Sequence, residues 1–92
     1  MIKGFKCKET EKIHTREGSK KFANIQKIAL RKLRMLQASK ELNDLKVPPG
    51  NHLEKLHKDR NGQHSIRVND QWRICFSWKD GDAYNVEIVD YH

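Results

Sequence analysis

The hydrophobic positions of this chain change period near its middle, from helical spacing to alternation. In the first half, apolar residues recur at spacings of three and four, as on one face of a helix, at Phe22, Ile25, Ala29, Leu33 and Leu36. Ser19 precedes them as a plausible N-cap, so the pattern predicts a long helix over about residues 20–38. The nearly opposite face carries a basic stripe of Lys20, Lys27, Arg31 and Arg34. The stripe has two interpretations, a solvated face or a surface for an RNA backbone or an acidic partner.

Weaker patterns flank this helix. Residues 1–7 alternate around Ile2 and Phe5 and indicate a short first strand, and residues 8–17 indicate a short helix ended by Gly18. After the long helix, residues 39–45 predict a short helical turn with Leu42 and Leu45 facing inward.

A polar connection follows this turn. The sequence VPPGN at residues 47–51 contains two prolines and a glycine, so we expect no regular structure there. Residues 52–63 are polar and contain the turn signal Asn61-Gly62. The VPPGN segment indicates a connector inside one domain rather than a linker between domains.

The last third of the chain predicts three strands, over residues 64–68, 71–78 and 83–92. Asn69-Asp70 separates the first pair and Asp80-Gly81 the second, and both are two-residue hairpin signals. The order of elements predicts an α+β fold, in which the two helices pack on one face of an antiparallel meander.

Strand alternation assigns the side chains to two faces of this meander. The apolar set should face the helices and comprises Ile66, Val68, Trp72, Ile74, Phe76, Val86 and Ile88. The other face should carry Ser65, Arg67, Arg73, Cys75, Val89 and Tyr91. Two arginines and a tyrosine are therefore expected to project from the side that the helices leave open. Arg73, between two apolar residues of a central strand, suggests an anion-binding group on a rigid element.

Length and composition narrow the class of protein. A chain of 92 residues predicts one domain, residues 1–92. The sequence has no apolar run of about 20 residues and no signal-like h-region, so we expect a cytoplasmic protein. Cys7 and Cys75 lack metal-site spacing and are expected to be buried thiols in strands, with no structural metal. A net charge of +7 favours nucleic acid, an acidic protein or an anionic membrane surface as partner.

The predicted open face carries groups suited to metal-free RNA cleavage. That reaction needs a base for the 2′-hydroxyl, a cation for the phosphate and an acid for the 5′-oxygen. Arginine supplies the cation, and Glu54, His57 and His92 are the acid–base candidates. Tyr91 can position or stack on a base. The α-carboxylate of His92 should raise the pKa of its imidazole, because it favours the protonated form.

Three segments carry a resemblance to a known family: PPGNHLEKLHKDRNGQHSIRVNDQWRICFSW, DGDAY and the ending VEIVDYH. They closely resemble HigB-type toxins of the RelE/ParE superfamily, the plasmid-maintenance killer proteins of type II toxin–antitoxin pairs. The resemblance implies a RelE-like microbial-RNase fold, a twisted antiparallel sheet with two N-terminal helices on one face. It also implies metal-independent cleavage of mRNA in the ribosomal A site.

The resemblance further implies partners. These are a HigA-like helix-turn-helix antitoxin, the ribosome with its mRNA, and operator DNA reached only through the antitoxin. It implies no cofactor and no membrane.

The resemblance also implies roles for individual residues. Arg73 matches the family's arginine at the scissile phosphate, His92 the terminal acid or base, and Tyr91 the stacking or orienting group. Asp90 matches the acid before them and is expected to orient, although its strand parity places it with the core set. Glu54 falls where some relatives have a carboxylate base.

The basic positions nearby are expected to bind RNA. Arg67 matches a second basic position of the family. His57 stands where relatives commonly have lysine, and its neutral form would stabilise phosphate charge less well. Lys55, Lys58 and Arg60 surround it and are expected to compensate.

Other candidates have structural interpretations. Trp72 and Trp78 share parity with the core and are expected to pack there rather than stack on bases. His14 and His52 are expected at the surface, as is His64. Two other functions stay open: a non-catalytic RNA- or protein-binding module, and a ParE-like poison of DNA gyrase on the same fold.

Overall fold

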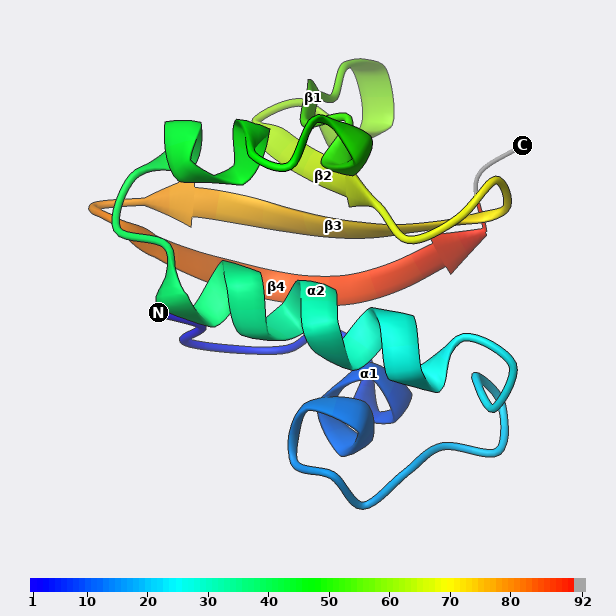
Figure 1. The fold of residues 1–92 in the computed structure, drawn as a ribbon. Helices are drawn as coiled ribbons and strands as arrows, with labels where there is room; N and C mark the ends of the chain where they lie inside the picture. The colour runs from blue at the N-terminus through cyan, green and yellow to red at the C-terminus, as the bar shows by residue number, and fades with distance from the viewer. Residues whose placement is uncertain (91–92) are drawn as a thin grey trace.

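The computed structural model describes residues 1–90, which form a four-stranded antiparallel sheet in the order β1-β2-β3-β4. The strands are β1 (Glu54–Lys55), β2 (Gln63–Arg67), β3 (Trp72–Lys79) and β4 (Asp82–Asp90). Figure 1 shows the long β3 and β4 crossing the molecule, with β2 and the very short β1 beside them. The predicted meander is confirmed, and β1 adds a strand that the polar sequence of residues 52–63 did not reveal.

The β3–β4 hairpin turns as its sequence predicts. Asp80 and Gly81 form the whole connection, with φ of 51° and 82°. Positive φ at both positions matches the twist of the flanking strands, and glycine adopts it without strain. A Cβ on Gly81 would also lie 3.2 Å from the carbonyl oxygen of Lys40. The hairpin is therefore specified both by local chemistry and by the segment packed against it.

The β2–β3 connection is longer than expected. It spans residues 68–71, because the Asn69 side chain closes an Asx-type turn: its Oδ1 accepts hydrogen bonds from the backbone N–H groups of Gln71 and Trp72, both at 2.8 Å. The prediction of a two-residue turn at Asn69-Asp70 is therefore wrong in length, although it located the reversal correctly.

Helices α1 (Lys8–His14) and α2 (Gln26–Ala38) complete the predicted α+β arrangement. Figure 1 shows α2 lying in front of the sheet and α1 below it. Ala29, Leu33 and Leu36 of α2 are buried in one cluster with Ile74 and Val86 of the sheet. The helical spacing and the strand alternation thus describe the two sides of a single core.

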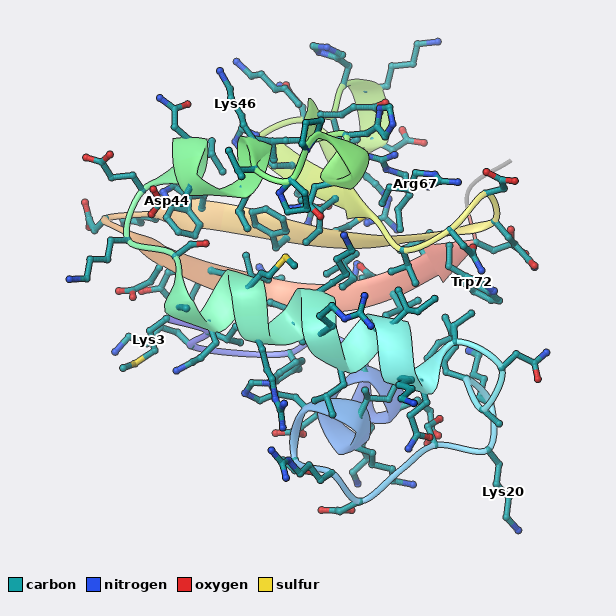
Figure 2. The ribbon with its side chains drawn as sticks, in the orientation of Figure 1. Lys3, Lys20, Asp44, Lys46, Arg67 and Trp72 are labelled. Carbon is teal, nitrogen blue, oxygen red and sulfur yellow. The ribbon has the colours of Figure 1, made fainter. Side chains whose placement is uncertain are left out.

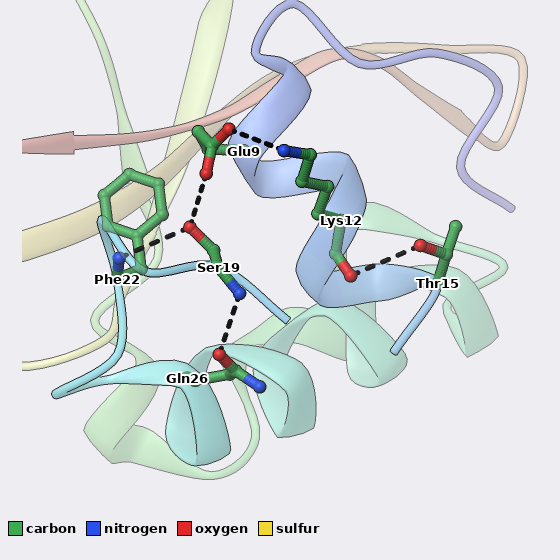
Figure 3. Close-up of polar contacts among 6 residues, drawn as sticks. All are labelled: Glu9, Lys12, Thr15, Ser19, Phe22 and Gln26. Atoms are coloured by element: carbon green, nitrogen blue, oxygen red, sulfur yellow. Dashed lines mark hydrogen bonds and ion pairs between the residues drawn. The ribbon is translucent and has the colours of Figure 1, made fainter. Parts of the chain in front are cut away.

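The long helix begins later than predicted, at Gln26 rather than near residue 20. Residues 20–25 form tight turns in which Ala23 and Ile25 donate three residues back, to Lys20 and Phe22. Figure 3 shows why: the hydroxyl of Ser19 donates to Glu9 Oε1 at 2.7 Å, and its backbone N–H donates to Gln26 Oε1 at 3.0 Å. These contacts tie the turn to α1 and leave Ser19 capping Phe22 rather than α2.

The first seven residues form isolated bridges rather than a regular strand. Ile2 pairs with Ala83 and Phe5 with Val86, in parallel orientation along the outer edge of β4. Further along that edge the backbone N–H of Ile88 donates to Thr10 Oγ1 at 3.0 Å. The N-terminal segment therefore covers an edge strand that would otherwise expose its hydrogen-bonding groups.

Two short 3-10 turns, η1 (Leu42–Lys46) and η2 (Pro49–Asn51), link α2 to β1, and a third, η3 (Lys58–Arg60), lies between β1 and β2. Leu45 is buried and Leu42 partly buried, as predicted. The VPPGN segment does contain regular structure, since Pro49–Asn51 form one 3-10 turn after a cis Val47–Pro48 bond.

Several side chains lie differently from their expected positions. Cys75 is buried in β3, but Cys7 is only partly buried and precedes α1. His14 is partly buried beside Phe5, at 5.4 Å between ring centroids, and is not a plain surface histidine. Trp72 and Trp78 pack against the core, as predicted. Within residues 1–90, no helix is long and apolar enough to cross a membrane.

Candidate active site

The candidate site lies on the sheet face opposite the main core. The strand register pairs Glu54 with Ser65, Ser65 with Cys75, and Arg67 with Arg73. Directly opposed residues point to the same face of a sheet, so these side chains share one surface. This is the arginine-bearing face that the strand alternation predicted, and we call these residues the arginine face.

Arg73 is buried rather than projecting, with 8% of its surface exposed. Its Nε donates to Ser65 Oγ at 2.8 Å, and its Nη2 donates to the backbone oxygens of Ser65 at 3.3 Å and of His52. These contacts fix the plane of the guanidinium. The expectation of an openly projecting arginine is wrong, because the chain around residue 52 lies against it.

Glu54 lies next to this cation at the rim of the arginine face. Its Oε1 is 3.9 Å from Arg73 Nη1, and its side chain is 52% exposed. The contact is an ion pair at the limit of close approach, and solvent screens it. A carboxylate beside a fixed guanidinium can accept a proton from a group bound between them, which is the geometry that a general base requires.

The carbonyl of His52 is positioned by its neighbour Asn51. Asn51 is fully buried, and its Nδ2 donates to the backbone oxygens of Leu45 at 3.1 Å and Val47 at 3.5 Å. Its Oδ1 accepts a hydrogen bond from Lys32 of α2. His52 then turns with a φ of 42°, which aims its carbonyl toward Arg73.

The sequence did not single out Ser65 and Asn51 as functional, although both organise Arg73. Ser65 carried a weak signal, since a small polar residue alternated with apolar ones on the arginine face. Asn51 looked like an ordinary turn residue. Its role depends on contacts with α2 that are far away in sequence.

Arg67 lies at the end of β2 on the arginine face (Figure 2), and its guanidinium forms an ion pair with Asp70. The Asp70 side chain is 98% exposed, so this pair is open to solvent and can exchange for a phosphate. Arg67 lies in register with Arg73 and, among the described residues, its guanidinium is bound only to an exposed partner, so it stays our candidate for the second anion-binding residue.

The remaining predicted basic residues have different surroundings. Arg60 donates to Gln63 at 3.0 Å and Glu87 at 3.2 Å, so it is already paired. Lys55 is in register with His64, so it belongs to the opposite face of the sheet from Glu54. Lys58 is exposed with a φ of 59°, and His57 is exposed next to it. Of these four, Arg60 lies on the side of the arginine face, because it pairs with Glu87, which is in register with Cys75.

Asp90 closes β4 in register with Trp72, one position beyond the Arg73–Val89 pair. Asp90 is therefore on the same face of the sheet as the core residues, as the strand alternation indicated. Its Oδ2 accepts a hydrogen bond from Gln71 Nε2 at 3.1 Å. Tyr91 and His92, the predicted terminal pair, lie outside the described residues.

Two neighbouring groups have altered proton affinities. Burial raises the pKa of the Cys75 thiol, although the guanidiniums of Arg60 and Arg73 act in the opposite direction. Burial, and then the charge of Lys55, lowers the pKa of His64. Both groups are therefore held neutral, and neither fits the role of a charged catalyst. Residues 1–90 contain no cluster of His, Cys, Asp and Glu that would hold a metal ion.

Sequence comparison connects this chain to known toxins. Residues 3–92 match the family model described as the RelE-like toxin of type II toxin–antitoxin system HigB. Toxin HigB-1 of Vibrio cholerae is 44% identical over 63 residues, covering 68% of this chain and 66% of the relative. Endoribonuclease HigB of Proteus vulgaris is 36% identical over 64 residues, covering 66% and 65%. The matches thus span slightly less than two thirds of either relative.

Structural comparison gives the fold. The YoeB–YefM toxin–antitoxin complex of Staphylococcus aureus contains a chain that superimposes with a TM-score of 0.58 at 17% identity. The superposition covers 100% of this chain and 98% of that one. At this identity the likeness establishes the fold alone, and it confirms the α+β prediction.

Proposed function

This chain belongs to the RelE-like HigB family of type II toxin–antitoxin toxins, and on that premise we propose that it is an endoribonuclease that cleaves mRNA on the ribosome. The observation that carries the proposal is Arg73, a guanidinium fixed in a central strand with Glu54 3.9 Å away. We propose the cytoplasm as its place of action, with residues 1–92 acting as one toxin domain.

The proposed reaction is attack of a 2′-hydroxyl on the adjacent phosphate. Arg73 stabilises the charge that develops on the phosphate oxygens, because its contacts to Ser65 and the His52 carbonyl leave it little freedom to reorganise. Glu54 takes the 2′-hydroxyl proton, and Arg67 exchanges Asp70 for a neighbouring phosphate.

His92 is proposed to donate the proton that the 5′-oxygen leaving group requires, and Tyr91 to stack on or orient a base. Asp90 is proposed to orient this terminal pair. This assignment of acid and base uses the chain's own residues without a metal ion.

Dependence on the ribosome follows from the weakness of this set alone. Glu54 is half exposed, Arg60 is already paired with Glu87, and Lys55, His57 and Lys58 are exposed to solvent. Holding the RNA in a near-attack geometry contributes several kcal/mol in such reactions. The ribosomal A site is the proposed source of that geometry, and we expect little cleavage of free RNA.

The proposed partner is a HigA-like helix-turn-helix antitoxin, through which operator DNA is contacted indirectly. The +7 charge of the toxin suits an acidic antitoxin segment, since opposite charges speed association.

Primer extension on a defined mRNA in a purified translation system tests the proposal. The native chain, with a free C-terminus, is compared with Arg73→Lys and His92→Gln, with and without ribosomes. We expect ribosome-dependent cuts within A-site codons, reduced about a hundredfold or more in Arg73→Lys. Lysine keeps the charge at this position but loses the fixed two-sided geometry of arginine.

The same preparation separates the competing functions. A folded native protein that leaves mRNA intact both with and without ribosomes overturns the nuclease proposal. DNA breakage by gyrase in its presence would then indicate a gyrase poison. Full activity in His92→Gln would contradict the assignment of His92 as the proton donor.

A further inference from the structure

Strand β4 contains a bulge between Tyr84 and Glu87. Cys75 of β3 pairs with Glu87, and Ser77, two residues later in β3, pairs with Tyr84, three residues earlier in β4. Strand β4 therefore has one extra residue in this interval, and Asn85 within it has a left-handed φ of 53°. A bulge of this kind re-aims side chains, because the residues beyond it change face.

The bulge brings Tyr84 to the side of the sheet that carries the arginine face. Strict alternation would place Tyr84 with Val86, which is fully buried in the core. Tyr84 is instead partly exposed and pairs with Ser77, which alternates with Cys75 and Arg73 along β3. RNA-binding sheets present aromatic side chains in this way, and unpaired bases stack on them.

Tyr84 lies at a short distance from the proposed catalytic arginine. Figure 1 shows the β3–β4 hairpin at one end of the sheet and the end of β4 at the other. Ser77, the partner of Tyr84, is four residues from Arg73 in β3, which is roughly 13 Å along the strand. Stacked nucleotides rise about 3.4 Å each, so about four of them span this distance, and fewer do when the RNA is extended.

A hollow of about 530 Å³ adjoins Tyr84. Its lining includes Tyr84 itself, Ser77 and Asn85, which offer an aromatic ring, a hydroxyl and an amide. Its charged lining residues are Lys79 and Asp80, one of each sign. A ring for stacking, with hydroxyl and amide groups beside it for hydrogen bonds, matches the two kinds of contact that proteins make with an unpaired base.

The cations near Tyr84 are balanced by carboxylates. A second, polar hollow of about 350 Å³ has Lys6, Arg60 and Asp59 in its lining and shares Ser77 with the first. Lys6 and Arg60 both pair with Glu87, at 3.5 and 3.2 Å between nitrogen and oxygen. Attraction of a phosphate depends on excess positive charge. The uncharged base is therefore the part of a nucleotide that suits this end of the sheet.

We propose that Tyr84 is a base-stacking platform for single-stranded RNA, which holds a nucleotide a few positions from the bond cleaved at Arg73. The inference rests on the proposed ribonuclease function for the identity of the ligand, and on the bulge and the hollow for the chemistry of the contact. The nucleotide belongs either to the mRNA or to ribosomal RNA, since both present the same unpaired base.

The first test measures binding of a labelled single-stranded RNA oligonucleotide by fluorescence anisotropy, with 2′-O-methyl groups that prevent cleavage. The native chain is compared with Tyr84→Phe, which keeps the ring, and Tyr84→Leu, which keeps apolar bulk without a ring. We expect native affinity in Tyr84→Phe and a loss of about fivefold or more in Tyr84→Leu. The loss should be equal at low and high salt, because the ring is uncharged.

The second test locates the base on the ribosome, where the A-site codon fixes the position of the mRNA. Single abasic nucleotides are placed in turn beside the cleaved codon, and KM and kcat are measured for the native chain and Tyr84→Leu. For an mRNA base, one abasic position should raise the native KM about fivefold and leave Tyr84→Leu unaffected, with kcat unchanged. A raised KM in Tyr84→Leu at every position would assign the base to ribosomal RNA.

The outcomes separate this inference from the proposed function. Native RNA affinity and native KM in Tyr84→Leu overturn the stacking platform, and ribosome-dependent cleavage by the native chain would still stand. Equal losses in Tyr84→Phe and Tyr84→Leu also overturn it, since they would assign the contact to the phenol hydroxyl. If the native chain does not cleave mRNA, the proposed function fails, and the oligonucleotide still measures the contribution of Tyr84. Thermal unfolding by circular dichroism checks both variants, and the abasic series on the native chain decides the question if Tyr84→Leu does not fold.

Discussion

At the scale of single residues, the candidate site depends on one buried cation and the oxygens around it. Arg73 is 8% exposed, and the carbonyl of His52 and the hydroxyl and carbonyl of Ser65 accept its hydrogen bonds. A buried charge is costly unless it is hydrogen-bonded. These contacts therefore serve the stability of the fold and the placement of the guanidinium together.

Glu54→Gln is expected to abolish proton abstraction without affecting the fold. The half-exposed side chain contributes little to stability, so the free energy of unfolding should change by less than about 0.5 kcal/mol. The cleavage rate on the ribosome should fall about a hundredfold or more. Asp59→Asn, an exposed carboxylate in η3, is the matched control and should cleave at the native rate. A native rate in Glu54→Gln would exclude this carboxylate as the base.

Asn51→Ala is expected to lower both stability and activity. It leaves the buried carbonyl of Leu45 without its donor and Lys32 without its acceptor, at a cost of about 1–3 kcal/mol. Denaturant unfolding measures this change. His52→Asn is the control, because it keeps the carbonyl and tolerates the positive φ of 42°. If both variants unfold like the native chain, Asn51 does not hold this loop.

At the scale of elements, the start of α2 shows how a tertiary contact displaces a local signal. Ser19 has the sequence of an N-cap, yet its hydroxyl bonds to Glu9 of α1 and its N–H to Gln26. Figure 3 shows Ser19 between these two helices. The residues after it therefore form tight turns, which still bury Phe22 and Ile25.

Ser19→Ala is expected to loosen this junction. Loss of the hydrogen bond from the Phe22 N–H to the hydroxyl should cost about 0.5–2 kcal/mol. The hydroxyl of Ser19, followed by Lys12, also lowers the pKa of Glu9. That contribution to stability is present above the unfolded pKa of Glu9 and is lost as the pH falls through its folded pKa. Thermal unfolding between pH 7 and pH 3 should show less acid sensitivity in Ser19→Ala, and parallel curves would contradict this.

At the scale of the whole molecule, basic charge is divided between two surfaces. Arg67 and Arg73 belong to the arginine face, and Lys27, Arg31 and Arg34 are exposed on α2. The arginine face is the surface for which we propose contact with RNA. Binding of a polyanion to either surface should be sensitive to salt, because exposed charges are screened at physiological ionic strength.

The stability of the whole fold should fall as the pH decreases from about 7.5 to 5.5. Burial, then Lys55, lowers the pKa of His64, so the unfolded chain binds a proton at this residue more readily than the folded chain. Acidification through the unfolded pKa of about 6.5 therefore favours unfolding. Denaturant midpoints measured across this range should decrease less in His64→Gln than in the native chain. Equal decreases would assign the effect to other groups.

The family signature and the local patterns predicted much of this fold. The alternation of Ile74 and Phe76 placed the core face of β3, and Asp80-Gly81 specified its hairpin. The same alternation located Arg73 on the opposite face and separated it from Asp90. These features depend on the spacing of apolar residues, every two to four positions, and on the residue preferences of turns. Both can be read from the sequence alone.

The tertiary structure decided how the arginine face is organised. A two-residue β1 brings Glu54 beside Arg73, and buried Asn51 joins α2 to the loop that covers the guanidinium. The delayed start of α2 and the pairing of Arg60 with Glu87 have the same origin. Each depends on contacts between residues far apart in sequence. No local period encodes such contacts, because they form only when the packed core holds the elements together.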